Sequence, residues 1–244
     1  MPPSPRPVLL SWSGGKDCLM ALQRLRADPA WRVVGLLTTV TAAFERVAMH
    51  GIRRSVLHAQ AAALGVPLLE SPLDWPSDND RYTRAFAASL EQARAATPGL
   101  MHVAFGDLFL ADVRGWREAL LAPLDWRGVF PLWGEDTHAL ARHFIAAGHR
   151  AVLTCVDTAQ LDASFSGRAF DDALLDALPP GVDPCGERGE FHTLCHGGPL
   201  FNHPLPIRRG VSRLREGRFQ YTDFTLRAPM PATHSAATGR DQPT

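Results

Sequence analysis

Lysine is almost absent from this sequence. Of the 25 basic residues in the 244-residue chain, one is a lysine, Lys16, and all the others are arginines. Because lysine is among the commonest residues of globular proteins, positive charge has been supplied as arginine almost everywhere. The lysine at position 16 therefore needs an explanation of its own.

The chain also lacks an excess charge of either sign and a long apolar run. The 25 basic residues are balanced by 25 acidic ones, which argues against a protein that binds nucleic acid or anionic lipid through a broad basic face. No stretch approaches the roughly 20 apolar residues that a membrane-spanning helix needs, and we identify no secretory signal segment. We therefore expect a cytoplasmic protein that binds neither membranes nor nucleic acid.

Cysteine is scarce. The four cysteines are Cys18, Cys155, Cys185 and Cys195, without a CxxC pair, which fits neither a disulfide framework nor a zinc ribbon. Metal-type ligands nonetheless gather in one region, at Cys185, His192, Cys195, His196 and His203. Their spacing is not one of the usual closed zinc patterns, so structural zinc is the weaker interpretation of this region.

Apolar runs alternate with helical patterns over the first half of the chain. Short runs that suit buried strands are residues 8–12, 31–38, 67–69 and 101–105. Apolar residues at helical spacing mark residues 17–26, 52–64, 81–96 and 112–121,. Strands that alternate with helices predict an α/β fold, with a parallel sheet covered by helices on both faces as in Rossmann-like domains.

The sequence pattern changes after residue 133. One more helical pattern (137–147) and one more apolar run (151–156) are followed by a stretch rich in Gly, Pro, Cys and His, residues 178–206. We place a domain change near Gly134, which gives a first domain over 1–133 and a smaller α/β domain over 134–227. Residues 228–244 are mostly Pro, Ala, Thr and Ser, so we expect a disordered tail.

The only lysine lies in a loop with the features of an anion site. The loop SWSGGKDC, residues 11–18, follows an expected strand and precedes an expected helix. Gly14 and Gly15 let the backbone bend so that N–H groups point inward, and the helix adds its positive end. The hydroxyls of Ser11 and Ser13 add donors, and a compact ammonium suits a phosphate. A simple turn with a solvated lysine is the alternative, but the strand and helix around the loop favour phosphate binding.

The SGGKD segment resembles the pyrophosphatase (PP) loop of the ATP pyrophosphatases, which split ATP into AMP and pyrophosphate. It is neither a Walker A loop nor a GxGxxG dinucleotide motif. The serine that usually follows is Cys18 here, and a thiol is the weaker donor. At a helix start, Cys18 is also a candidate for a reactive thiol with a depressed pKa.

Further segments resemble one family of this class, the diphthine-ammonia ligases. They are MHG at 49–51, QA at 60–61, GVP at 65–67, FGDL at 105–108, FPLW at 130–133 and DPCGERGEFHT at 183–193. The resemblance covers about residues 7–224. It implies an ATP-binding PP-loop domain of the adenine nucleotide alpha hydrolase type over 1–133, and a substrate-recognition domain over 134–227. The implied activity is amide formation, in which ATP adenylates the carboxylate of diphthine, a modified histidine, and ammonia displaces AMP. A lysine-poor composition suggests a high-GC genome, so the acceptor is left open.

The resemblance and the loop assign roles to individual residues. The candidate catalytic residues are Lys16, Asp17 and Asp107. The candidate ATP contacts are Ser11, Ser13, Gly14, Gly15, Lys16, Asp17, Cys18, Thr38, His50, Gly51 and Gly106. We expect Thr38 and Thr39 at the end of the second strand, on the ligand side of the sheet. Asp17 and Asp107 are also the candidate ligands of the Mg²⁺ that ATP brings, although either could cap its following helix. Arg53 is either a solvated charge or an aid to phosphate binding.

The GExGEFHT segment, residues 186–193, supplies the candidate substrate contacts. They are Glu187, Gly189, Glu190, His192 and Thr193. Two acids around two glycines predict a polar, flexible segment rather than a core strand. Their carboxylates, with aromatic help from Phe191, suit a cationic group of a substrate. A solvated surface turn is the alternative.

Three functions are weighed against each other. The leading one is a ligase whose partners are ATP with Mg²⁺, a carboxylate on a small molecule or modified protein side chain, and ammonia or an amine. A PP-loop tRNA-modifying enzyme would need a basic appended domain or a CxxC pair, which this sequence lacks. A non-catalytic ATP- or AMP-binding module would not need the GExGEFHT segment. A homodimer is left open.

Overall fold

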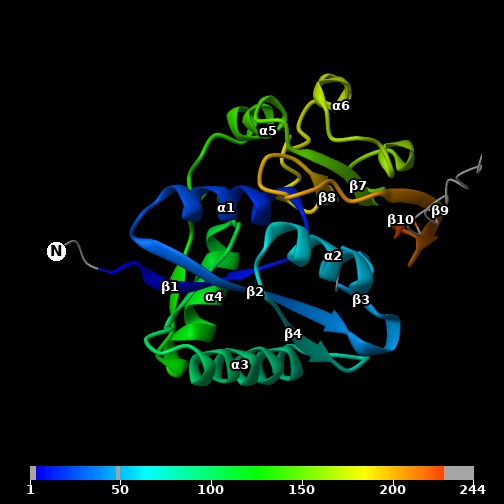
Figure 1. Ribbon diagram of the computed structural model, residues 1–244. Coiled ribbons are helices and arrows are strands. Elements are labelled where there is room, and N and C mark those ends of the chain that lie inside the picture. Colours follow the sequence, from blue (N-terminus) through cyan, green and yellow to red (C-terminus); the bar gives the residue numbers. More distant parts are fainter. Residues whose placement is uncertain (1–3, 48–49, 228–244) are drawn as a thin grey trace, which may run out of the picture.

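A computed structural model describes residues 4–47 and 50–227 of the chain (Figure 1). Its first sheet has five parallel strands in the spatial order β4 (Leu68–Leu73), β2 (Trp31–Thr41), β1 (Arg6–Ser11), β5 (His102–Ala104) and β6 (Arg127–Val129). A short strand, β3 (Arg46–Val47), pairs antiparallel with the end of β2. The strand order reverses between β1 and β5, so the carboxyl ends of these two strands form the switch point at which α/β sheets bind ligands.

Helices cover both faces of this sheet, as the sequence predicts (Figure 1). One face packs against α1 (Lys16–Ala27) and α2 (Arg54–Leu64), and the other against α3 (Asn79–Ala96) and α4 (Ala111–Leu121). Alternation along β1 explains this division, because Val8 and Leu10 lie in the core with α1 and α2, whereas Leu9 lies in the core with α3,.

The second sheet is antiparallel and lies in the C-terminal part of the chain. Its strand order is β8 (Phe191–Gly197), β7 (Arg150–Asp157), β10 (Phe219–Leu226) and β9 (Ile207–Arg215). Two helices, α5 (Thr137–Ala146) and α6 (Asp172–Ala177), lie beside it (Figure 1). Single turns of 3₁₀-helix complete the elements, at Ala42–Phe44, Ala122–Leu124 and Ala163–Phe165.

One hydrophobic core joins the two sheets. Leu10 and Leu22 of the first half belong to the same buried cluster as Phe144 and Leu194 of the second half. At the surface, the carboxylate of Asp223 in β10 accepts hydrogen bonds from Arg53 Nε (3.0 Å) and Arg46 Nη1 (3.0 Å). Arg53 therefore ties the two halves together and is not a freely solvated charge.

The expected helices are all present, with ends within about two residues of those predicted,. One prediction about strands was wrong and another was right only in part. Strand β2 continues to Thr41, so Thr38 and Thr39 lie inside it and not at its end. In the GExGEFHT segment, residues 186–190 lie outside any strand as expected, but residues 191–193 belong to the strand β8, which pairs with β7. The predicted tail, 228–244, and Met49 lie outside the described residues.

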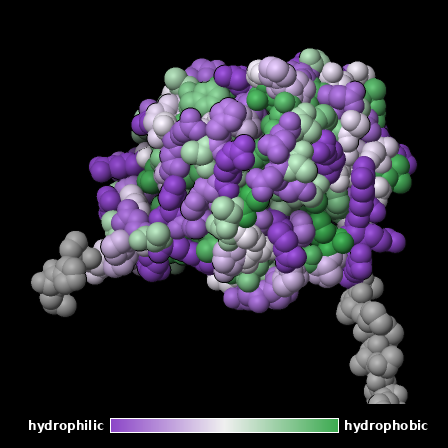
Figure 2. Space-filling view, turned by 90° about the horizontal axis from the view of Figure 1, so that it is seen from above, coloured by the Kyte–Doolittle hydropathy of each residue, from purple (hydrophilic) through white to green (hydrophobic). Residues whose placement is uncertain are grey.

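The surface seen in Figure 2 is mostly hydrophilic, with hydrophobic residues in small separate groups. Within residues 4–47 and 50–227, the helices are all too short or too polar to cross a membrane.

Candidate functional site

A cavity of about 230 Å³, here called the inner cavity, opens at the carboxyl ends of β1 and β5. Most of its lining residues come from three segments: the end of β1 with the loop after it, the segment after β5, and the loop leading into β8 with the start of β8. His50 and Arg117 of α4 complete the lining, which is Ser11, Ser13, Gly15, Lys16, Asp17, Cys18, His50, Phe105, Gly106, Asp107, Arg117, Gly186, Glu187, Gly189, Phe191, His192 and Thr193. The fold thus brings the SGGKD loop and the GExGEFHT segment together at one cavity.

The loop after β1 bends at Gly14, whose φ of +85° is a conformation that favours glycine,. Helix α1 begins at Lys16, and its first backbone bond runs from Leu19 N to Gly15 O (3.2 Å). The amides of Asp17 and Cys18 precede that bond and lie at the positive end of the helix. The loop has the geometry of an anion site.

The loop is held in place by β8 and α2. The hydroxyl of Thr193 accepts a hydrogen bond from Lys16 N (3.0 Å), and Gly14 O accepts one from Cys195 N (2.9 Å). Gln60 of α2 is fully buried and donates to both Gly14 O (2.9 Å) and Cys195 O (2.6 Å). Sequence reasoning did not identify Gln60 as a site residue. The available signal was a polar side chain on the buried face of an apolar helix.

Lys16 is buried, with a relative exposure of 2%. Its ammonium donates to both carboxylate oxygens of Asp17 (2.7 and 2.8 Å) and to the carbonyl oxygen of Cys185. Burial alone would lower the pKa of Lys16, but Asp17 and Cys185 beside it hold that pKa above its usual value. Lys16 is therefore a fixed positive charge, and a phosphate must displace Asp17 or Cys185 from it.

Two more carboxylates face the inner cavity. Asp107 accepts hydrogen bonds from Nε (2.6 Å) and Nη2 (3.0 Å) of Arg117. No feature of the sequence had indicated Arg117 as a site residue. Glu187 Oε1 accepts one from Leu108 N (2.8 Å), which ties the GExGEFHT segment to the loop after β5. Burial raises the pKa of Glu187 to about 7, and the charge of Asp17 adds to the effect. Three acids and two cations thus share this small space.

The donor set fits a magnesium ion that arrives with phosphates. Mg²⁺ takes oxygen ligands and is commonly held by one or two carboxylates together with substrate phosphates. Asp17 and Asp107 both line the cavity and supply such oxygens. No group of three or more His, Cys, Asp or Glu side chains in the described part of the chain is arranged to hold a metal by itself. The thiol of Cys185 instead donates to Thr137 O (3.4 Å).

Several expected site residues lie away from the cavity wall. Gly14, Thr38, Gly51 and Glu190 are not among its lining residues. Thr38 is buried within β2. Glu190 is also buried, and its Oε1 accepts a hydrogen bond from Asp183 N (3.0 Å), so its carboxylate holds its own loop together. Glu187 is therefore the acid of this segment that faces the cavity.

Cys18 and His192 line the cavity as uncharged groups. Burial raises the pKa of the Cys18 thiol to about 11, and the thiol donates to Gly15 O (3.1 Å). The prediction of a reactive thiol was therefore wrong, because burial outweighs the helix dipole at this position. Burial, with the nearby His50 and Lys16, lowers the pKa of His192 well below its usual value. The rings of His50 and His192 lie 4.3 Å apart.

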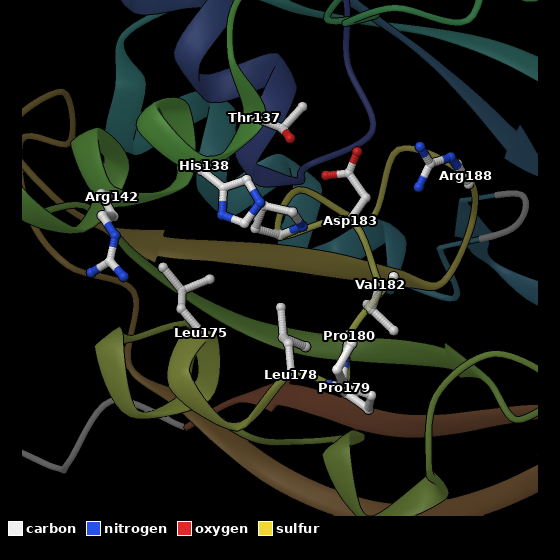
Figure 3. A pocket seen from close by; sticks show the side chains of 12 residues that line it. Thr137, His138, Arg142, Leu175, Leu178, Pro179, Pro180, Val182, Asp183 and Arg188 are labelled. Carbon is white, nitrogen blue, oxygen red and sulfur yellow. The ribbon is translucent and has the colours of Figure 1, made fainter.

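A larger cavity of about 430 Å³, here called the outer cavity, lies on the other side of the loop that precedes β8 (Figure 3). Its walls are the first turns of α5, the end of α6, residues 178–184 and Arg188. Asp183 and Arg188 face the outer cavity, while Gly186 and Glu187 between them face the inner one. One loop therefore separates the two cavities.

Comparison with known families identifies both parts of the chain. The model of the diphthamide synthase N-terminal domain matches residues 7–120, and that of the diphthamide synthase C-terminal domain matches residues 136–222. A search of curated proteins gave no match.

Proposed function

The chain belongs to the diphthamide synthase family, and from this premise we propose that it is an ATP-dependent ligase that adenylates a carboxylate and transfers the acyl group to ammonia or an amine. Family membership indicates a PP-loop enzyme that uses ATP, of the diphthine-ammonia ligase kind. Our proposal adds three points to family membership: the adenylation step, ammonia or an amine as the nucleophile, and a carboxylate as the acceptor.

The observation that carries this proposal is the position of Lys16. The lysine lies at the switch point of the parallel sheet, at the start of α1, and lines the inner cavity together with Glu187 and His192. A phosphate-binding loop that shares a cavity with a polar segment of the C-terminal half suits a reaction between ATP and a second substrate. A module that only binds ATP has no use for that segment.

In the first half of the proposed reaction, an acceptor carboxylate oxygen attacks the α-phosphorus of ATP and the bond to pyrophosphate breaks. Negative charge then grows on the pyrophosphate. Lys16, the amides at the start of α1 and the hydroxyls of Ser11 and Ser13 stabilise that charge from preorganised positions. Mg²⁺ on Asp17 and Asp107 would neutralise further phosphate charge when bound.

In the second half, ammonia attacks the activated carbonyl carbon, the bond to AMP breaks, and the nitrogen loses a proton to solvent. Glu187, Gly189 and His192 line the inner cavity and come from the C-terminal half, so we assign them to the acceptor side. His192 is neutral, and so it contacts the acceptor as an uncharged hydrogen-bonding group,. Glu190 holds its own loop together by accepting a hydrogen bond from Asp183 N. Thr193 positions the SGGKD loop by accepting one from Lys16 N.

The test is the identity of the products. The protein is incubated with MgATP, ¹⁵N-ammonium and a cell metabolite extract, and the mixture is analysed by mass spectrometry. The proposal predicts AMP, pyrophosphate and an amide that carries ¹⁵N, and a loss on the order of 100-fold in Lys16→Ala, because one preorganised stabilising charge is removed. ATP binding without AMP formation would support a non-catalytic module, and a product attached to tRNA would support a tRNA-modifying enzyme.

A further inference from the structure

The outer cavity has the size of a small-molecule site. Pockets for such ligands are usually about 300–1,000 Å³. The outer cavity, at about 430 Å³, lies in this range, whereas the inner cavity, at about 230 Å³, falls below it. An acceptor needs space beside ATP, and the adjoining outer cavity offers it.

The outer cavity is apolar on one side and polar on the other, where Arg142 supplies a positive charge. Leu175 and Leu178 point into it from the end of α6, and Val182 continues this apolar wall (Figure 3). His138 and Arg142 face them from α5. An organic ligand with an apolar body and an anionic group matches both walls.

The guanidinium of Arg142 is only loosely paired. The nearest oxygens of Asp172 and Asp176 lie 3.9 and 3.8 Å from its nitrogens, beyond hydrogen-bond distance, and Arg142 is 63% exposed,. Asp183, the acid among the lining residues, already accepts a hydrogen bond from Cys185 N (2.7 Å) through Oδ1. Arg142 thus keeps donors for an anionic ligand, for which the planar guanidinium is well suited.

Cys185 links the two cavities. Its carbonyl oxygen accepts a hydrogen bond from Lys16 in the inner cavity, and its thiol donates to Thr137 O at the wall of the outer cavity. A ligand in the outer cavity therefore lies one loop thickness from the lysine of the phosphate loop.

We propose that the outer cavity binds an organic anion with an apolar body, and that this anion is the acceptor of the ligase reaction or a part of it. The second half of this statement rests on the proposed function. The first half rests on the cavity alone and is tested without ATP.

The probe is 8-anilinonaphthalene-1-sulfonate, an apolar anion whose fluorescence rises on binding. It is titrated into the full chain, into the variant Arg142→Gln/Leu178→Glu and into the matched control Arg213→Gln/Leu214→Glu on the exposed strand β9. The proposal predicts saturable binding, a Kd at least about tenfold higher in the cavity variant, and a Kd within about twofold of wild type in the control. Circular dichroism melting verifies that both variants fold.

Equal probe binding by all three proteins, or no saturable binding by the wild type, would overturn the assignment of the cavity. The acceptor role is tested by competition. Carboxylates that raise AMP formation must displace the probe, and an acceptor that raises AMP formation without displacing it would remove this role while the ligase remains. If no carboxylate raises AMP formation, the proposed function fails while the probe result stands.

Discussion

The carboxyl group of Glu187 offers a prediction about stability whose size follows from the structure. Its pKa is raised from 4.5 to about 7, first by burial and then by the negative charge of Asp17. A carboxyl group with a raised pKa in the folded state costs stability above its unfolded pKa, and the cost is complete above the folded pKa. A pKa shift of about 2.5 units lowers the free energy of unfolding by about 3 kcal/mol at pH 8, and by less than about 1 kcal/mol at pH 5.

The variant Glu187→Gln removes this charge and keeps an oxygen that can accept the hydrogen bond from Leu108 N. We expect it to be more stable than the wild type by up to about 3 kcal/mol at pH 8, with most of the gain lost at pH 5. Urea unfolding at both pH values measures this difference. The control Glu118→Gln changes an exposed acid paired with Arg114 and should shift stability by no more than about 0.5 kcal/mol,.

A Glu187→Gln protein that is no more stable than the wild type at pH 8, or that gains equally at both pH values, would refute this electrostatic account of the site. The predicted gain has a meaning for function. A group that destabilises the folded state and yet lines the same cavity as Lys16 is expected where function requires it,.

Two further predictions concern hydrogen bonds and pH. Gln60→Met removes the side-chain hydrogen bond that fixes Gly14 O, so the KM for ATP should rise by about tenfold or more, with a smaller change in kcat,. Steady-state kinetics measure both values. The control is Gln23→Met, which loses a hydrogen bond to His149 instead. Burial lowers the pKa values of His149 and His192, so their protonation favours unfolding below about pH 6.5, by up to about 1.4 kcal/mol per pH unit for each group. Protonation of Glu187 acts in the opposite direction over this range, so the test is the difference between two proteins. The urea midpoint of His149→Gln should rise relative to that of the wild type between pH 7.5 and pH 5.5,, and a difference that does not change with pH would contradict this reasoning.

The helices and the parallel sheet could be predicted because their signals are local. The apolar residues of α1 recur every three or four positions, and the run at β1 is short and bounded by Pro7 and the Gly14–Gly15 turn,. Strands β8 and β9 lack such signals. β8 alternates weakly through His and Thr residues, and β9 is mostly exposed and rich in arginine. These strands form because β7 and β10 offer partners, which is a long-range effect.

The residues of the candidate site likewise divide into those that local motifs predict and those whose positions depend on long-range packing. Lys16 and Asp107 stand in local motifs at strand ends, and the fold places both on the cavity wall. The burial of Glu190 against Asp183 N, and of Thr38 inside β2, depends on packing that no short motif encodes. Arg117 reaches Asp107 from the next helix, ten residues away in sequence. Such pairings are fixed only when the elements are assembled.

We propose above that Lys16 lies at the site where ATP is cleaved to AMP and pyrophosphate. Phosphorus NMR of MgATP incubated with the protein, ammonium and a carboxylate mixture detects this cleavage, and Lys16→Met is the matched variant. We expect equal amounts of AMP and pyrophosphate from the wild type and almost none from Lys16→Met. ADP and phosphate as products, or equal turnover by the two proteins, would contradict it.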